Sequence, residues 1–405
     1  SATVHIPSPM IWQEMLAVPQ LVRFTYPFQD GDTRYPTLII KAHSLLLKYI
    51  LQKVPLTISF FQTSDLRCGY ALHIADDPAD GVFLWALLAD KDESAAIADL
   101  STHGGCSIYL FNEACANCAW TCATITVDPS VKAIVDASPS GDPDPAQYTK
   151  QIDRILSRIR ASDYTEMSYS VSPTSTWKPL HSTFIMNGVR SSSLNLLFDN
   201  EGSYQEQLAH AILGDLSPIG AYLNTQLLER SGNKEFADLV LTHEFGAIIL
   251  ESKTLSVFDQ RETLPSRRRL EKNVLKSAKK ALSQLNGAIR TLRNNIQISD
   301  AEGNIIQIER SKPIHAIILV PELELFSNND QEWLGNISTF EKKSGDFLHV
   351  LDTIELFRMM QAAHMISEEY YNVTPMMAFD LYLKKRAEAV AINRTIVFDM
   401  LFRSN

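Results

Sequence analysis

From residue 202 onward, apolar and polar residues follow patterns that predict a regular order of helices and strands. Apolar residues at helical spacing predict a helix over residues 203–213. Ser203 opens this stretch and Glu206 follows three residues later, which is the arrangement of a capping box at a helix start. We therefore expect the helix to begin at Ser203.

The next elements are short apolar runs of strand length and one long amphipathic stretch. Two of the runs are joined by a tight turn, His243-Glu-Phe-Gly246, which is typical of an antiparallel hairpin. The last run is continuous and rich in isoleucine, as in a buried parallel strand. The three strands, the long helix and the fourth strand are predicted at residues 221–228, 236–242, 247–253, 266–295 and 314–320. This order of helix, three strands, helix and strand predicts an α/β core.

The rest of the chain divides into segments of different character. Residues 136–145 are rich in Pro, Ser, Gly and Asp, which indicates a break, and a helix is predicted over 146–161. Before the break, strands are predicted at residues 70–74, 82–89 and 107–111, and a helix or buried segment at 39–53. The end of the chain is predicted to be mostly helical, with 347–365 as its longest helical segment. We therefore predict a separate N-terminal α/β domain, a linker with one helix, the α/β core and a C-terminal helical region, at residues 1–135, 136–195, 196–325 and 326–405.

Bulk composition narrows the class of protein. Hydrophobic residues make up 45% of the chain and charged residues 21%, which is ordinary for a globular protein with a substantial core. The net charge of −10 means that any nucleic-acid surface has to be a local basic one. No apolar run reaches the roughly 18 residues of a membrane helix, and the first residues lack the pattern of a signal peptide. We expect a cytoplasmic protein without a membrane span.

The five cysteines leave two interpretations open. Their odd number, and their absence from the C-terminal part of the chain, argue against a disulfide framework. Cys115 and Cys118 have the spacing of a zinc half-site, which Cys106 and Cys122 could complete. The interpretation that we favour over this structural zinc site is close packing of small buried residues.

The sequence Glu251-Ser252-Lys253 ends an apolar strand with two opposite charges. Side chains alternate along a strand, so Glu251 and Lys253 project from one face and Ser252 from the other. Charges at the end of a buried strand are costly unless they are paired or bind a metal. Asp238 lies in the preceding strand, and antiparallel pairing would bring its carboxylate close to that of Glu251. An ordinary ion pair at a strand end is the alternative interpretation.

This set of residues suits metal-dependent phosphodiester hydrolysis. Carboxylate oxygens of Asp238 and Glu251 are the hard ligands that Mg²⁺ or Mn²⁺ prefers. Lys253 would orient or activate a water molecule and offset developing negative charge. Glu206, on the first helix, could add a ligand or hold a metal-bound water. We therefore predict Asp238, Glu251 and Glu206 as metal ligands and count all four residues as catalytic.

A strand aspartate, a turn and an apolar strand ending Glu-x-Lys resemble the PD-(D/E)xK nuclease superfamily, in its nuclease-related and restriction-endonuclease-like branches. The resemblance covers residues 201–322, and no Pro precedes Asp238 as the full signature would have it. It implies a restriction-endonuclease-like core and Mg²⁺-dependent (or Mn²⁺-dependent) cleavage of nucleic acid. It also implies roles near the metal for Lys280 and Gln284 on the long helix, where Gln284 would join the catalytic residues.

The predicted long helix is basic although the chain is acidic. From Arg267 to Arg293 there are nine Lys and Arg residues, and Glu271 is the only acidic one. Such a stripe can contact phosphates and release counterions, whereas the alternative is a solvated helix face. The residues that we predict to bind nucleic acid are Arg267, Arg268, Arg269, Lys272, Lys276 and Lys280.

We therefore predict a metal-dependent endonuclease that hydrolyses DNA, with RNA as the second choice of substrate. The resemblance further implies an effector in prokaryotic defence against phage or foreign DNA. A protein partner or a second copy would bind through the N-terminal or C-terminal region. The alternatives are a non-catalytic nucleic-acid-binding scaffold subunit with a nuclease-like fold and a structure-specific nuclease of DNA repair.

Overall fold

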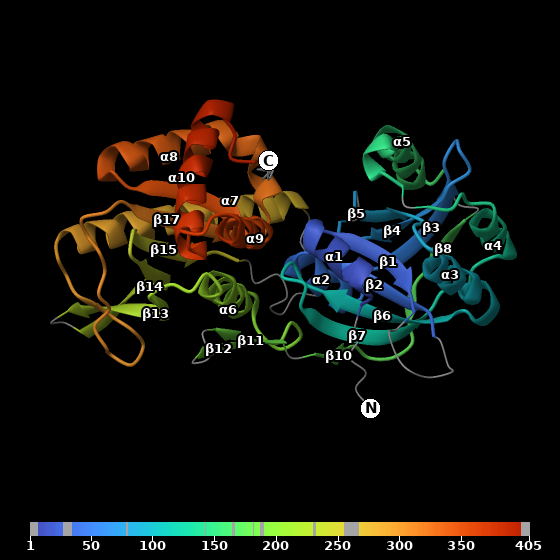
Figure 1. The fold of residues 1–405 in the computed structure, drawn as a ribbon, viewed down its shortest axis with the longest axis horizontal. Helices are drawn as coiled ribbons and strands as arrows, with labels where there is room; N and C mark the ends of the chain where they lie inside the picture. The colour runs from blue at the N-terminus through green and yellow to red at the C-terminus, as the bar shows by residue number, and fades with distance from the viewer. Residues whose placement is uncertain are drawn as a thin grey trace. The chain divides into compact units, whose positions relative to one another are not determined.

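The computed structural model contains two compact units (Figure 1). The first unit comprises residues 1–182 and 195–198, and the second comprises 183–194 and 199–405. The structure describes residues 7–26, 35–77, 80–141, 143–163, 167–180, 182–186, 190–229, 232–254 and 267–397. No helix in these ranges combines the length and the apolar character that a membrane span needs.

The first unit mixes helices with two sheets, as the sequence predicts for an α/β domain. Its strands form one sheet in the order β1-β2-β6-β7-β10, with β9 also on β7, and another in the order β5-β4-β3-β8. The strands are β1 Leu21–Thr25, β2 Thr37–Lys41, β3 Leu56–Gln62, β4 Cys68–Ile74, β5 Val82–Leu87, β6 Gly105–Phe111, β7 Asn117–Thr124, β8 Ser168–Ser170, β9 Ser172–Pro173 and β10 Lys178–Pro179. The helices are α1 Pro9–Ala17, α2 Ser44–Leu51, α3 Lys91–His103, α4 Pro129–Asp136, the short η1 Pro145–Gln147 and α5 Thr149–Arg160.

The segment that we expected to be a linker with one helix contains that helix, α5, and several short strands. Strand β8 pairs with β3, and β9 and β10 pair with β7, so this segment extends both sheets of the first unit. Two further strands, β11 Ser182–Met186 and β12 Arg190–Leu194, pair with each other. Turn-forming residues marked the break at 136–145, but they did not reveal the strands that follow it.

The second unit is built on a six-stranded mixed sheet in the order β16-β13-β14-β15-β17-β18. The strands are β13 Gly220–Glu229, β14 Gly232–His243, β15 Gly246–Ser252, β16 Ile298–Ser299, β17 Ile314–Val320 and β18 Phe347–Asp352. The helices are α6 Glu201–Gly214, α7 Arg267–Arg293, the short η2 Leu323–Asn329, α8 Asp330–Ser344, α9 Thr353–Glu369 and α10 Pro375–Asn393. The predicted helix, three strands, long helix and strand are present in that order, and the short β16, which was not predicted, lies between α7 and β17. Residue 266, where we expected the long helix to begin, lies outside the described residues.

Strands β14 and β15 form a hairpin whose register, turn and neighbouring strand are defined by the pairing. The two strands are antiparallel, with Leu239 opposite Leu250 and His243 opposite Gly246. Gly246 has a φ of 145°, and a Cβ there would lie 2.7 Å from the Pro313 carbonyl oxygen. The turn therefore requires glycine at this position. Strand β15 then pairs in parallel with β17, and β17 with β18, so their carboxyl ends lie at the same end of the sheet.

Helices cover both faces of this sheet. One face of α7 is apolar at helical spacing and packs, with α8, on the sheet face that carries Val240, Ile249 and Ile318. The side chains of Ser252 and Ile249 point to opposite faces of the sheet. Ser252 accepts a hydrogen bond from Gln205 of α6, so α6 covers the face opposite to α7. Helices α9 and α10 pack against β18. The C-terminal region thus belongs to the same compact unit as the predicted core.

Two expectations about elements in this unit were wrong. The cap of α6 is Asn200, whose side chain accepts a hydrogen bond from the Ser203 N–H, so Ser203 is not the cap. Residues 347–365 are not one helical segment, because β18 occupies the first part and α9 begins at Thr353. A short apolar run is compatible with a strand or a buried helix, and here parallel pairing with β17 decides for a strand.

Candidate active site

The β14–β15 hairpin brings two acidic residues together at the carboxyl end of β15. Asp238 directly precedes Leu239 and Glu251 directly follows Leu250, and those two leucines are opposite each other. Both acidic residues are buried, with exposed fractions of 7% for Asp238 and 1% for Glu251. Lys253 follows β15, and its N–H donates to a carbonyl oxygen of β17. The sequence thus places three charged groups at one end of a buried hairpin.

The side chains of these three residues converge, as the alternation along β15 predicted. Lys253 Nζ lies 2.8 Å from Glu251 Oε2 and 3.4 Å from Asp238 Oδ2. The N–H of Ser252 donates to the same Asp238 oxygen at 2.7 Å. Glu251 and Lys253 therefore share one face of β15, while Ser252 points to the other.

Two carboxylates of the cluster are strongly perturbed. Burial, with a further contribution from Asp238, raises the pKa of Glu251 to about 7, although the Lys253 ammonium opposes the shift. The pKa of Glu206 is also raised to about 7, by burial first and then by Asp238, Glu235 and Glu251, again against Lys253. Burial lowers the pKa of Lys253, but Asp238 and Glu251 raise it by more. Negative charge in the cluster thus exceeds the single positive charge.

Helix α6 holds Glu206 beside the hairpin through the adjacent residue. Gln205 is buried, and its Nε2 donates to Ser252 Oγ and to the Leu319 carbonyl oxygen, both at 3.1 Å. The amide thereby ties α6 to the ends of β15 and β17. Sequence reasoning missed Gln205, because a glutamine in a helix gives no sign of what it faces. The only available signal was its position beside Glu206.

The composition of the cluster suits a hard divalent cation. Asp238, Glu251 and Glu206 offer carboxylate oxygens, the ligands that Mg²⁺ and Mn²⁺ prefer, and their excess negative charge favours a cation. Within the described ranges, no three His, Cys, Asp or Glu side chains already stand in metal-ligating geometry. The three carboxylates are the residues that could hold the metal.

The residues predicted on α7 have different surroundings. Gln284 Oε1 is buried without a hydrogen-bond partner, and in the described part of the chain no hydrogen bond or ion pair joins Gln284 or Lys280 to Asp238 or Glu251. Arg267 forms an ion pair with Glu322, two residues after the end of β17. The other predicted nucleic-acid contacts are exposed side chains without an ion pair to any described residue, namely Arg268, Arg269, Lys272, Lys276 and Lys280.

The four cysteines considered for zinc lie in the first unit. Cys106, Cys115 and Cys118 are buried, and Cys122 is half-buried. Burial raises the pKa of the Cys106 thiol to about 12, with a further contribution from Cys122.

Comparison with known proteins leaves the interpretation to the geometry of the site. No family model matches the sequence, and no curated protein and no solved structure matches the chain. The arrangement of Asp238, Glu251, Lys253 and Glu206 is therefore the basis for assigning a function.

Proposed function

We propose that the second unit has a restriction-endonuclease-like core and is a Mg²⁺-dependent nuclease that hydrolyses phosphodiester bonds in DNA. The observation that carries the proposal is the convergence of Asp238, Glu251 and Lys253 at the carboxyl end of β15. A plain ion pair would need only one carboxylate for the Lys253 ammonium. Here Glu206 adds a third carboxylate from another element, and two of the three have a raised pKa.

Each residue has a role that follows from its position. A bound Mg²⁺ or Mn²⁺ polarises the phosphate and lowers the pKa of a water molecule. Asp238 and Glu251 would hold it, with Glu206 as a further ligand or as the group that positions the water. The Lys253 ammonium is held by both carboxylates and places positive charge where negative charge develops on the phosphate. Water would attack phosphorus and release a proton to solvent, and the bond from phosphorus to the leaving oxygen would break as that oxygen takes up a proton from solvent.

The exposed basic residues of α7 support nucleic acid as the substrate. Helix α7 follows the candidate catalytic strand in the chain and packs on the same sheet. Its exposed lysines and arginines can contact phosphates without reading the base sequence. By the resemblance to defence nucleases, we place the protein in prokaryotic defence against foreign DNA. Its partner, or a second copy, would bind through the first unit or the C-terminal helices.

A cleavage panel tests the proposal. Labelled double-stranded DNA, single-stranded DNA and RNA are incubated with the protein in Mg²⁺, Mn²⁺ or EDTA, and products are separated on denaturing gels. We expect metal-dependent cleavage of DNA that EDTA and Glu251→Gln both abolish. A protein that binds nucleic acid but cleaves none of the three substrates with either metal would instead be a scaffold subunit.

A further inference from the structure

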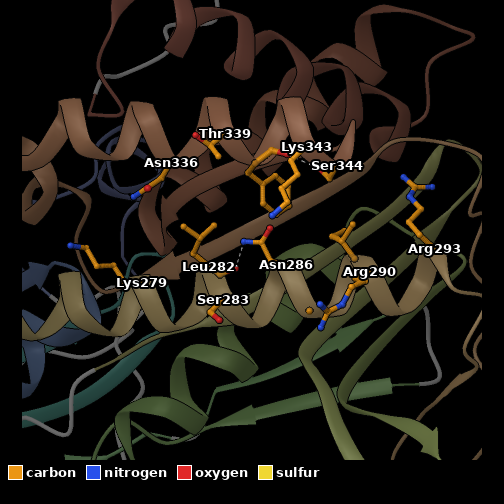
Figure 2. A pocket seen from close by; sticks show the side chains of 13 residues that line it. Lys279, Leu282, Ser283, Asn286, Arg290, Arg293, Asn336, Thr339, Lys343 and Ser344 are labelled. Carbon is orange, nitrogen blue, oxygen red and sulfur yellow. Dashed lines mark hydrogen bonds between the residues drawn. The ribbon is translucent and has the colours of Figure 1, made fainter.

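A groove of about 750 Å³ runs between α7 and α8 on the outer side of the second unit. Both helices pack on the same sheet face, and the side chains between them form the groove (Figure 2). Its lining contains four cations and no carboxylate, although the chain as a whole is acidic. The cations are Lys279, Arg290, Arg293 and Lys343.

Two of these cations are neutralised and two are not. Lys279 forms an ion pair with Glu332 at 2.6 Å, and Arg293 forms one with Asp346 at 2.5 Å. Arg290 on α7 and Lys343 on α8 are exposed and have no ion pair with any described residue. Uncompensated positive charge therefore stands on both walls of the groove, which favours an anionic ligand.

The remaining lining can contact the uncharged parts of such a ligand. Leu282 is half-buried and exposes apolar surface, Ile289 and Phe340 are buried at the base of the groove, and Asn286 and Asn336 contribute amides. Figure 2 shows Asn286 of α7 and Lys343 of α8 pointing toward each other across the groove. Cations, amides and apolar surface together suit a ligand that carries phosphates, hydrogen-bonding edges and flat apolar faces. A simple inorganic anion would use only the cations.

We propose that this groove binds a single-stranded segment of nucleic acid. Single strands are bound by a cationic groove that follows the backbone, with apolar surface for the base faces. Leu282 in the groove can contact the face of a base only in a single strand, because a duplex keeps its base faces stacked inside the helix. The choice of nucleic acid over another polyanion rests on the proposed nuclease function.

The groove is separate from the candidate active site. Helix α7 joins the parallel strands β15 and β17, so it runs antiparallel to both. Its first residue, Arg267, pairs with Glu322 beyond the carboxyl end of β17, and its last, Arg293, pairs with Asp346 before β18. Glu251 lies at the carboxyl end of β15, whereas Arg290 and Arg293 lie toward the amino ends of the strands. The exposed lysines Lys272 and Lys276 lie along α7 before the groove, and Lys280 directly follows Lys279, which lines it.

The test measures binding without cleavage. Fluorescence anisotropy follows labelled single-stranded DNA, single-stranded RNA and a DNA duplex of equal length in EDTA, over a series of salt concentrations. The variant is Arg290→Ala with Lys343→Ala, and the control is Lys342→Ala, an exposed neighbour on α8 outside the groove. Circular dichroism melting checks that each variant is folded.

We expect the double variant to bind single strands roughly tenfold more weakly at physiological salt and to show a flatter salt dependence, by about 1.4 in the logarithmic slope, since each lost single-strand contact removes about 0.7. The Lys342→Ala control should bind as the wild type does. The strand type that the wild type binds more tightly identifies DNA or RNA as the ligand. Unchanged affinity and slope in the double variant, or an equal loss for the duplex, would overturn the proposal.

The binding and cleavage experiments together distinguish a wrong groove proposal from a wrong nuclease proposal. If the wild type cleaves nothing in any metal but the double variant still loses single-strand binding, the groove stands and the nuclease assignment falls. If the wild type cleaves and the double variant binds single strands as well as it does, the reverse holds.

Discussion

Gln205 Nε2 on α6 donates to Ser252 Oγ on β15 at 3.1 Å, and this bond connects the Glu206 helix to the strand that carries Glu251. A second bond from the same amide group reaches the Leu319 carbonyl oxygen. Gln205 touches neither Asp238 nor Glu251 through any hydrogen bond in the described part of the chain. Its effect on the candidate active site is therefore one of positioning.

We predict that Gln205→Ala lowers the free energy of unfolding by about 1–3 kcal/mol, because a buried carbonyl oxygen loses its donor. Cleavage should fall as well, because Glu206 loses its anchored neighbour. Urea unfolding and initial cleavage rates measure the two effects. Gln331→Ala, at an exposed position of α8, is the control and should change neither. A Gln205→Ala protein with wild-type stability and rate would show that the amide does not position the helix.

We predict that Asp238→Asn, Glu251→Gln and Lys253→Met each lower the cleavage rate at least a hundredfold while the protein stays folded. Each substitution nearly preserves side-chain shape but removes the charge that would hold the metal or stabilise the phosphate. Initial rates in Mg²⁺ and circular dichroism spectra are the measurements. Wild-type cleavage by the Glu251→Gln protein would remove Glu251 from the proposed catalytic set.

Metal binding has a readout that does not depend on cleavage. We predict that saturating Mg²⁺ raises the thermal unfolding midpoint of the wild-type protein, because a ligand bound only by the folded state stabilises it by about 2.7 kcal/mol at a hundred times its dissociation constant. EDTA should reverse the shift, and Asp238→Asn combined with Glu251→Gln should abolish it. Equal Mg²⁺-induced shifts in the wild type and the double variant would place the metal elsewhere.

Because His243 is buried, we predict that the protein loses stability in mild acid. Burial, opposed by Asp380 and reinforced by His315 and Lys384, lowers the pKa of His243 to about 4. Below pH 6.5 the His243 imidazole binds a proton in the unfolded chain but not in the folded protein. The contribution of neutral His243 to the free energy of unfolding is therefore present above pH 6.5 and is lost as the pH falls toward 4.

The measurement is urea unfolding between pH 7.5 and pH 4.5, a range chosen to span roughly the ordinary pKa of histidine. Across it, we expect the unfolding free energy of the second unit to fall by about 1–3 kcal/mol more in the wild type than in His243→Asn, which keeps an acceptor for the Phe245 N–H. The exposed His103→Asn control should follow the wild type. Superimposable pH profiles of wild type and His243→Asn would contradict this assignment.

We predict opposite effects on stability when alanine replaces two glycines of the second unit, Gly246 in a turn and Gly335 in a helix. Gly246 has a φ of 145° and little space, so Gly246→Ala should destabilise the β14–β15 hairpin by about 1–3 kcal/mol. Gly335 lies within α8, where an added Cβ would meet no atom within 4 Å, so Gly335→Ala should stabilise by roughly 0.5–1 kcal/mol. Thermal unfolding of both variants checks the opposite signs. Stabilisation by Gly246→Ala would refute the strain at the turn.

Local patterns in the sequence were sufficient for the elements of the second unit that carry the candidate site. Alternation along β15 determines that Glu251 and Lys253 share a face, because successive strand side chains point to opposite sides. The turn before Gly246 determines the hairpin, and the helical spacing of apolar residues determines α7. These signals need only neighbouring residues, so they could be read without the fold.

Only the tertiary structure decided which distant residues meet. Phe347–Asp352 became a strand because β17 offered it a parallel partner, and nothing within the run itself distinguishes a strand from a buried helix. Gln205 became a link to Ser252 because α6 packs on that face of the sheet. The groove exists because α7 and α8 lie side by side, which brings Arg290 and Lys343 to one space. Such contacts depend on long-range packing, and a local sequence pattern carries no record of the partner.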